Sequence, residues 1–242
     1  MGKHTNFILR PIEKNLEDAT CAIRGISGMA RIPLNEYFLQ SVFLRMTGEQ
    51  EQKMKCICWE LATDDYDYRY KTYYERWNLG QCSKLDEKNK VYGELCEHIQ
   101  DYKVEDVVKQ GILNQAKQII DDFYNCAGLF IGNERAFTDF SFVFSKIVKS
   151  DICSSSKLLK STKSANLPST YSVADIYTNN LYRHRNRCAH NTLSYQEPSI
   201  TLTKLESDNV IYENYFLYFA LLIMIDKLFI HAYNAYLLQQ EY

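Results

Sequence analysis

Residues 210–240 read VIYENYFLYFALLIMIDKLFIHAYNAYLLQQ, and this run is the strongest structural signal in the chain. A surface helix carries its apolar side chains along one stripe, whereas a helix that is apolar on nearly all sides is buried. We therefore predict a long closing helix around which the other helices pack. The longest uninterrupted apolar stretch, residues 215–225, is shorter than the roughly 20 residues of a membrane-spanning helix. We expect a buried core helix and no membrane association.

The composition favours helices over strands in the rest of the chain as well. Of 242 residues, 14% are aromatic, whereas glycine (9) and proline (4) are scarce. Few helix breakers and many long side chains are typical of a helical bundle. We predict an all-α, single-domain bundle over residues 1–242, with its core at about 36–240. The net charge of −2 provides no overall attraction to nucleic acid, so binding to a polyanion would need a local basic patch.

Apolar residues recur at helical spacing along most of the chain. They predict helices at residues 15–29, 36–46, 49–63, 64–77, 91–102, 104–124, 135–148 and 172–189. Asn15 is the expected N-cap of the first helix, and Ser172, with Asp175 three residues later, the expected N-cap of the last. The tyrosine-rich segment 64–77 also alternates like a strand, and its tyrosines could stack nucleic-acid bases or make core or dimer contacts. The polar residues expected outside the packed face of 49–63 are Glu49, Gln52, Lys53 and Glu60.

Residues 149–170, KSDICSSSKLLKSTKSANLPST, differ in composition from their surroundings. Serine and lysine are frequent and large apolar residues are few, which predicts a mobile connector. Its lysines, among them Lys157 and Lys160, could contact the backbone of a nucleic acid. The alternative is a solvated linker in which the lysines serve solubility.

The eight cysteines do not have the spacing of a disulfide framework or a structural zinc site. They contain no C-x-x-C pair, and the chain begins MGKHTNFILRPIEKN, without an apolar signal segment. We expect free thiols in the reducing cytoplasm, and neither a metal nor another cofactor.

The candidate functional residues lie in residues 181–196, LYRHRNRCAHNTLSYQ, at the end of the helix predicted over 172–189. Neutral imidazole, here of His190, can take a proton from a ribose 2′-hydroxyl, and protonated imidazole can return one to a leaving 5′-oxygen. The guanidinium of Arg185 can donate two hydrogen bonds to two oxygens of one phosphate, and it can stabilise the negative charge that develops on them in the transition state. The amide of Asn186 can orient either group. These residue types suit metal-independent RNA cleavage that leaves a 2′,3′-cyclic phosphate.

Helical geometry places some of these side chains together. Asn186 and His190 are four residues apart and share a face, Arg187 is three residues from His190, and Arg183 lies two turns back. Arg185 is offset by roughly 140° from His190 on an ideal helix, so it must reach round, or the helix must unwind before His190. A purely structural alternative is an arginine-rich helix end at which His190 faces the last carbonyl groups.

The run Arg185-Asn186-Arg187-Cys188-Ala189-His190 resembles the signature of HEPN domains (higher eukaryotes and prokaryotes nucleotide-binding), in which an arginine and a polar residue precede a histidine near a helix end. The resemblance implies an all-α bundle with Arg185 and His190 as catalytic pair and Asn186 as the accompanying polar residue. Arg183 fits the looser limit of the spacing, so the choice of arginine stays open. Arg183 and Arg187 would then contact the substrate.

The resemblance also implies a setting. Similar proteins are commonly toxins or antiviral effectors that cut RNA as homodimers with a composite active site, often beside an antitoxin or another defence-system partner. One departure concerns regulation. Where such toxins are silenced by adenylylation, a tyrosine follows the histidine at the second position, and Thr192 stands there. The alternative function is a non-catalytic module that dimerises and binds a nucleotide or a protein.

Overall fold

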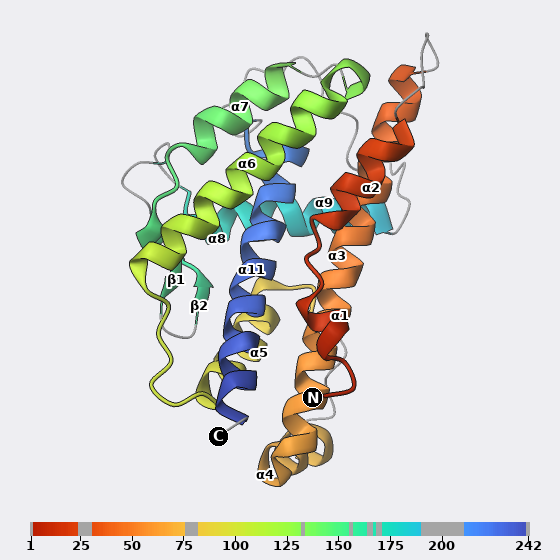
Figure 1. Cartoon of the computed structure of the whole chain (residues 1–242). Helices are drawn as coiled ribbons and strands as arrows, with labels where there is room; N and C mark the ends of the chain where they lie inside the picture. Colours follow the sequence, from red (N-terminus) through yellow and green to blue (C-terminus); the bar gives the residue numbers. More distant parts are fainter. Residues whose placement is uncertain are drawn as a thin grey trace.

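The closing helix α11 (Tyr215–Gln240) forms the centre of the computed structural model (Figure 1). Each residue of 216–225 is at most 2% exposed, and α11 packs against α1, α3, α5, α6 and α7. The prediction of a long buried closing helix is confirmed. By length and composition alone α11 could cross a membrane, but 78% of its most apolar window is buried inside the protein.

The structure describes residues 2–23, 31–75, 82–131, 134–154, 157–163, 167, 171–189 and 211–240. These residues are mostly helical, which confirms the all-α fold class. The α-helices other than α11 are α1 (Thr5–Leu9), α2 (Lys14–Ile23), α3 (Arg31–Asp64), α4 (Tyr66–Arg69), α5 (Leu85–Glu97), α6 (Asp106–Ile131), α7 (Glu134–Phe144), α8 (Val173–Asp175) and α9 (Arg183–Ala189). Two π-helices, η1 (Tyr70–Glu75) and η3 (Ile176–Tyr182), a 3₁₀ turn η2 (Lys149–Asp151) and strands β1 (Ile152–Ser154) and β2 (Lys157–Leu159) complete the described elements.

Helix α3 is a single helix of 34 residues, where the sequence predicted two. The predicted break, between residues 46 and 49, contains Gly48, which costs a helix only about 1 kcal/mol relative to alanine. Packing of α3 against α11, α5 and α9 outweighs this cost. The prediction that Lys53 and Glu60 lie outside the packed face is wrong, because they are only 3% and 6% exposed.

The N-terminal segment also differs from its prediction. Helix α1 was not expected, and Asn15 does not cap α2, since it lies one residue inside the helix. Its amide instead donates to the carbonyl oxygen of Ile12 at 3.0 Å and to the Glu49 carboxylate at 2.7 Å. Asn15 therefore ties α2 to α3. Residues 24–29, expected at the end of this helix, lie outside the described residues.

The helices after α3 follow the predicted order with shifted ends. The described part of segment 64–77, residues 64–75, is helical rather than extended: Asp65 caps α4 by accepting from the Tyr68 amide at 2.9 Å, and η1 continues it. Helix α5 begins at Leu85, before its predicted start at residue 91, because Leu85 and Lys88 belong to its buried face. Helix α6 extends beyond residue 124, and α7 ends before residue 148.

The prediction of a mobile connector over 149–170 is wrong for residues 149–154 and 157–160. Strands β1 and β2 form an antiparallel hairpin in which Ile152 pairs with Leu159. Leu158 and Leu159 are fully buried, and the Leu158 amide donates to Asn89 of α5 at 2.9 Å. The hairpin is held because these two leucines fill the core. Residues 155–156, 164–166 and 168–170 lie outside the described residues.

The helical run that leads to the candidate site begins as predicted. Ser172 accepts a hydrogen bond from the Asp175 amide at 3.1 Å, and Asp175 accepts one from the Ser172 amide at 2.8 Å. The run continues through α8, η3 and α9 to Ala189. Its middle third is π-helical, so the face that α9 presents to the bundle cannot be calculated from the ideal α-helical angle.

Candidate functional site

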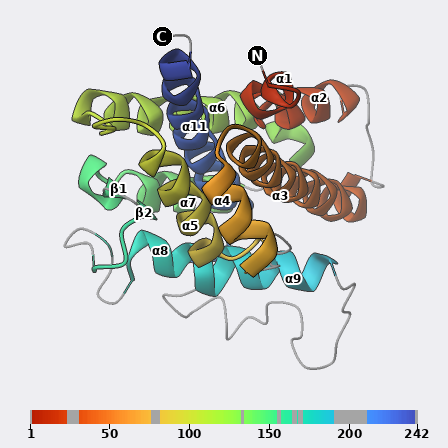
Figure 2. The same cartoon turned by 90° about the horizontal axis from the view of Figure 1, so that it is seen from below.

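The arginines of the motif lie on α9, which packs against α3 on the side away from α1 (Figure 2). The last described residue of α9 is Ala189, so His190 and its predicted alignment with Asn186 lie outside the described residues. Arg183 is exposed, and Arg185, Asn186 and Arg187 are half-buried.

Arg185 is held at the seam between α9 and α3. Its guanidinium lies 3.2 Å from the Glu51 carboxylate of α3 and donates to the Asn186 side-chain oxygen, also at 3.2 Å. The Arg185 side chain is 25% exposed and that of Glu51 13%. Arg185 is therefore oriented by two protein acceptors and still reaches solvent. The Asn186 carbonyl group faces the arginine, which agrees with an orienting role for this amide.

A buried lysine lies behind this pair. Lys88 of α5 is 2% exposed, and its ammonium contacts the Met54 sulfur at 3.6 Å. Burial lowers the pKa of Lys88 to about 8, and the neighbouring charges of Glu51 and Arg185 act on it in opposite directions. Lys88 is not among the functional residues predicted from the sequence. The available signal was its spacing: Lys88 stands between Leu85 and Val91 on the apolar face of α5.

Replacing Lys88 by methionine is expected to stabilise the protein at pH 7 by about 2 to 3 kcal/mol, because a buried charge is removed at nearly constant volume. The pKa of Lys88 in the folded protein lies below its ordinary value of 10.5, so the penalty for burying the charge is full below pH 8 and disappears as pH rises toward 10.5. The advantage of Lys88→Met should therefore shrink at alkaline pH. Urea unfolding at pH 7 and at about pH 9.5 measures the difference in unfolding free energy between Lys88→Met and wild type, with Lys90→Met at an exposed position as control. Equal differences at both pH values would contradict the prediction.

His184 joins α9 to the core, and both of its ring nitrogens have partners within the protein. Its Nε2 lies 2.7 Å from the Tyr215 hydroxyl, and its Nδ1 accepts from Arg187 at 2.9 Å. The ring also packs against Phe43 and Tyr218, with centroids 5.5 Å away in both cases. Burial, and then the nearby Arg187, lower the pKa of His184 to about 4. The imidazole is therefore neutral at pH 7, and the Arg187 guanidinium is directed at it.

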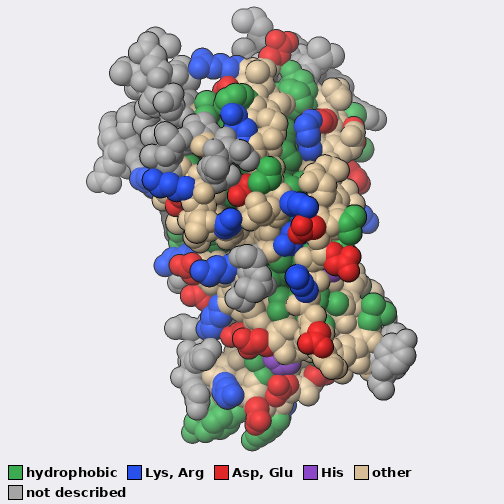
Figure 3. Space-filling model, turned by 90° about the vertical axis from the view of Figure 1, so that its left-hand side faces the viewer, with side chains coloured by type: hydrophobic (Ala, Val, Ile, Leu, Met, Phe, Trp, Pro, Cys, Tyr) green, Lys and Arg blue, Asp and Glu red, His purple; other side chains and the backbone are tan. Residues whose placement is uncertain are grey.

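The predicted lysines of the connector lie away from Arg185. Lys157 is exposed on β2, and the Lys160 carbonyl accepts from the Ala174 amide at 3.4 Å, at the beginning of the run that ends in α9. Ten residues lie between Ala174 and Arg185, seven of them in η3, so more than two turns of helix separate the two positions. Basic and acidic side chains are interspersed on the face of the molecule nearest β1 and β2 (Figure 3). The structure thus does not bring these lysines together with the motif.

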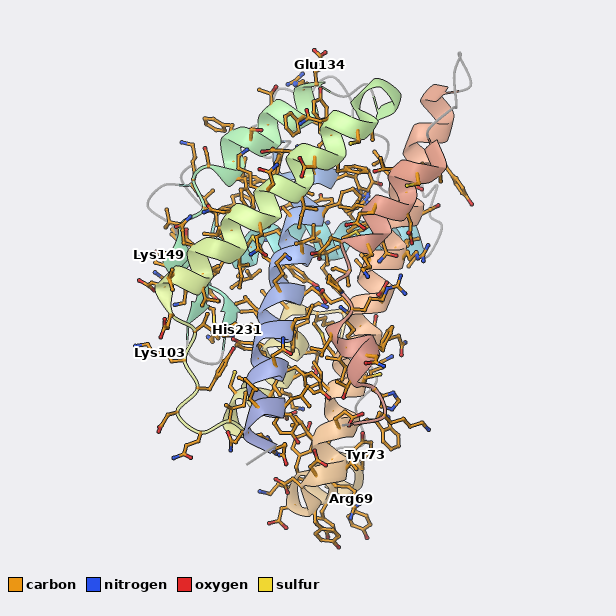
Figure 4. All side chains as sticks on the ribbon, viewed as in Figure 1. Arg69, Tyr73, Lys103, Glu134, Lys149 and His231 are labelled. Carbon is orange, nitrogen blue, oxygen red and sulfur yellow. The ribbon has the colours of Figure 1, made fainter. Side chains whose placement is uncertain are left out.

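His231 and the cysteines have structural surroundings. His231 of α11 (Figure 4) is half-buried, and its Nδ1 lies 2.9 Å from the Tyr102 hydroxyl, which agrees with a satisfied core group. The eight cysteines are free thiols, and burial raises the pKa of the Cys58 thiol to about 12. Within the described ranges no three His, Cys, Asp or Glu side chains are grouped so that they could hold a metal ion.

Comparisons of the chain with protein-family models, with curated proteins and with solved structures found no match. The function proposed below therefore depends on the residues and contacts of the chain itself and on the resemblance of its motif.

Proposed function

We propose that the chain is a metal-independent endoribonuclease of the HEPN type, which cuts RNA and leaves a 2′,3′-cyclic phosphate. The observation that carries the proposal is the position of Arg185. Glu51 and Asn186 hold its guanidinium at 3.2 Å near the end of a helix, partly exposed and five residues before His190. A guanidinium oriented before the substrate arrives can stabilise developing charge without reorganisation.

In this mechanism the ribose 2′-oxygen attacks phosphorus while His190 takes its proton, and the bond to the 5′-oxygen breaks. A protonated imidazole returns a proton to that oxygen. Arg185 binds the phosphate oxygens, on which negative charge increases. Because one imidazole accepts and another donates, two copies of the motif facing each other in a homodimer would supply both groups. The protein would act in the cytoplasm as a toxin or antiviral effector, with an antitoxin or other defence-system protein as partner.

The test is incubation of the purified protein with end-labelled RNA in EDTA, followed by analysis of the product ends. Wild type is expected to produce 2′,3′-cyclic phosphates, and His190→Ala, with an unchanged melting temperature, is expected to lose cleavage. If His190→Ala cut RNA as fast as wild type, the proposal would be wrong.

A second candidate is a non-catalytic module that dimerises and binds a nucleotide or a protein. It is favoured by the fact that Arg185 and Arg187 have intramolecular partners in Glu51 and His184. Such pairs also occur in arginines that only join helices. This candidate predicts no RNA cleavage and no toxicity on expression, with wild type and Arg185→Ala behaving alike.

A further inference from the structure

A groove lies between the N-terminal residues, the outer face of α3 and the C-terminal part of α11. Its volume is about 960 Å³. In Figure 1 the labelled N-terminus and the C-terminal end of α11 lie near the lower part of α3, and Figure 2 shows α1 and α9 on opposite sides of α3. The groove and the Arg185 site therefore lie on different sides of α3, although the Glu51 carboxylate contacts both Lys55 and Arg185. Its chemically distinctive lining residues are Lys3, His4, Lys55, Trp59, Glu60 and Asp64.

Trp59 presents an aromatic surface to solvent at this groove. The residue is 56% exposed, although tryptophan is usually largely buried. Its ring contacts Tyr73 with centroids 5.5 Å apart and planes at 51°, which orients the indole from one side. An oriented and exposed indole is suited to stack on a flat ring.

Basic groups border the same groove. Lys3 is exposed, and the Lys55 side chain is 29% exposed with its ammonium 3.7 Å from Glu51. That separation is long for an ion pair, so the Lys55 ammonium can turn toward an anion at little cost. Lys3 and Lys55 together favour a ligand with negative charge.

Two carboxylates restrict which anion can bind. Glu60 accepts from the His4 amide at 2.7 Å, and Asp64 accepts from the Tyr236 hydroxyl at 2.5 Å. The negative charge of each carboxylate repels a bare anion, and its remaining lone pairs can accept hydrogen bonds from hydroxyl or amino groups of a ligand. The lining of the groove therefore suits a ligand that combines a flat ring, hydrogen-bond donors and a separate negative charge.

We propose that this groove binds a nucleotide unit, with the base stacked on Trp59, the phosphate beside Lys55 and Lys3, and ribose or amino groups donating to Glu60 or Asp64. A nucleotide carries all three features, whereas inorganic phosphate or a hydrocarbon carries one. The volume also lies within the range of small-ligand sites, roughly 300 to 1,000 Å³. The unit is either a free nucleotide or part of a single-stranded RNA.

The experiment uses Trp59 as its own reporter. The sequence contains two tryptophans, so the full chain with Trp77→Phe has Trp59 as its single indole. Its fluorescence is titrated with AMP, with a short single-stranded oligoadenylate and with inorganic phosphate. Saturable quenching by AMP identifies a free nucleotide as a ligand, and quenching by the oligonucleotide alone identifies an RNA unit. Quenching by neither overturns the proposal, and so does an equal response to inorganic phosphate.

A matched pair of variants tests the placement of the phosphate. In the Trp77→Phe background, Lys55→Gln is expected to weaken binding about tenfold, because a charged hydrogen bond is lost. Lys90→Gln removes the same charge from an exposed position on α5 and should bind like the parent. Equal affinities of the two variants would overturn the assignment of Lys55. Neither measurement depends on RNA cleavage, so this site and the nuclease proposal fail separately.

Discussion

Replacing Arg185 by alanine is expected to lower kcat/KM for RNA cleavage at least about a hundredfold, since removal of one oriented donor to a developing oxyanion costs roughly 10² to 10³ in rate. The expectation is large because Arg185 is held by Glu51 and Asn186 before substrate binds. Arg185→Lys keeps the charge but loses the paired geometry, so it should recover only part of the rate. Initial rates on a labelled RNA in EDTA provide the measurement.

Two controls make this result interpretable. Arg135→Ala removes a well-exposed arginine of α7, whose guanidinium lies 3.9 Å from Asp139, and should leave cleavage unchanged. Arg183→Ala tests the other arginine that fits the spacing: a larger loss there than for Arg185→Ala would transfer the phosphate role to Arg183. Because Arg185→Ala also removes the nearer of the two basic partners of Glu51, the other being Lys55, the double variant with Glu51→Gln separates lost catalysis from lost stability. If Arg185→Ala and Arg135→Ala cut RNA equally fast, Arg185 has no catalytic role.

Asp226→Ala is expected to lower the free energy of unfolding by about 3 to 5 kcal/mol, the usual cost of leaving one member of a buried ion pair alone. Asp226 of α11 and Lys53 of α3 are 1% and 3% exposed and lie 2.7 Å apart. Asp226 also accepts from the Ile12 amide at 3.0 Å, and Lys53 donates to the Arg10 carbonyl. The pair thus joins α3, α11 and the link between α1 and α2. Urea unfolding at pH 7 measures the loss.

Removing both charges tests the same explanation. The double variant Lys53→Met, Asp226→Leu should recover most of the loss, because replacing a whole buried pair by apolar groups is often neutral. Burial raises the pKa of Asp226 to about 6, above its ordinary value of 3.8. The stabilisation that protonation of Asp226 adds is therefore fully present below about pH 4 and is lost as pH rises through 6, where the ion pair with Lys53 remains. The double variant should lack this dependence. A loss below about 1 kcal/mol in Asp226→Ala would contradict the prediction.

The fold was largely predictable because its strongest signals are local. All-round apolarity identified α11, and a serine followed by an acidic residue identified the beginning of α8. The errors arose where tertiary packing decided the outcome. Gly48 does not interrupt α3, because the packing of α3 against α11, α5 and α9 stabilises the helix. The lysine- and serine-rich segment forms strands because Leu158 and Leu159 are buried in the core.

The candidate site was predictable only in part. The sequence motif placed Arg185 and Asn186 near a helix end, as the structure has them. The partner Glu51 stands 134 residues away in the chain, and a single sequence contains no sign of such a long-range pair. A lysine such as Lys88 resembles a solvated residue until the buried face of its helix is known.

The π-helical turn η3 sets the orientation of everything that follows it. Each turn of π-helix accommodates about one residue more than a turn of α-helix, which amounts to a phase difference of roughly 100°. With an ordinary α-helix over Ile176–Tyr182, α9 would be rotated about its axis. The contacts of Arg185 with Glu51 and of His184 with Tyr215 would then both be lost. The extra residue thus acts as a phasing element: an α-helix one residue shorter would present α9 in the same orientation, whereas an α-helix of the same number of residues would turn the motif away from α3.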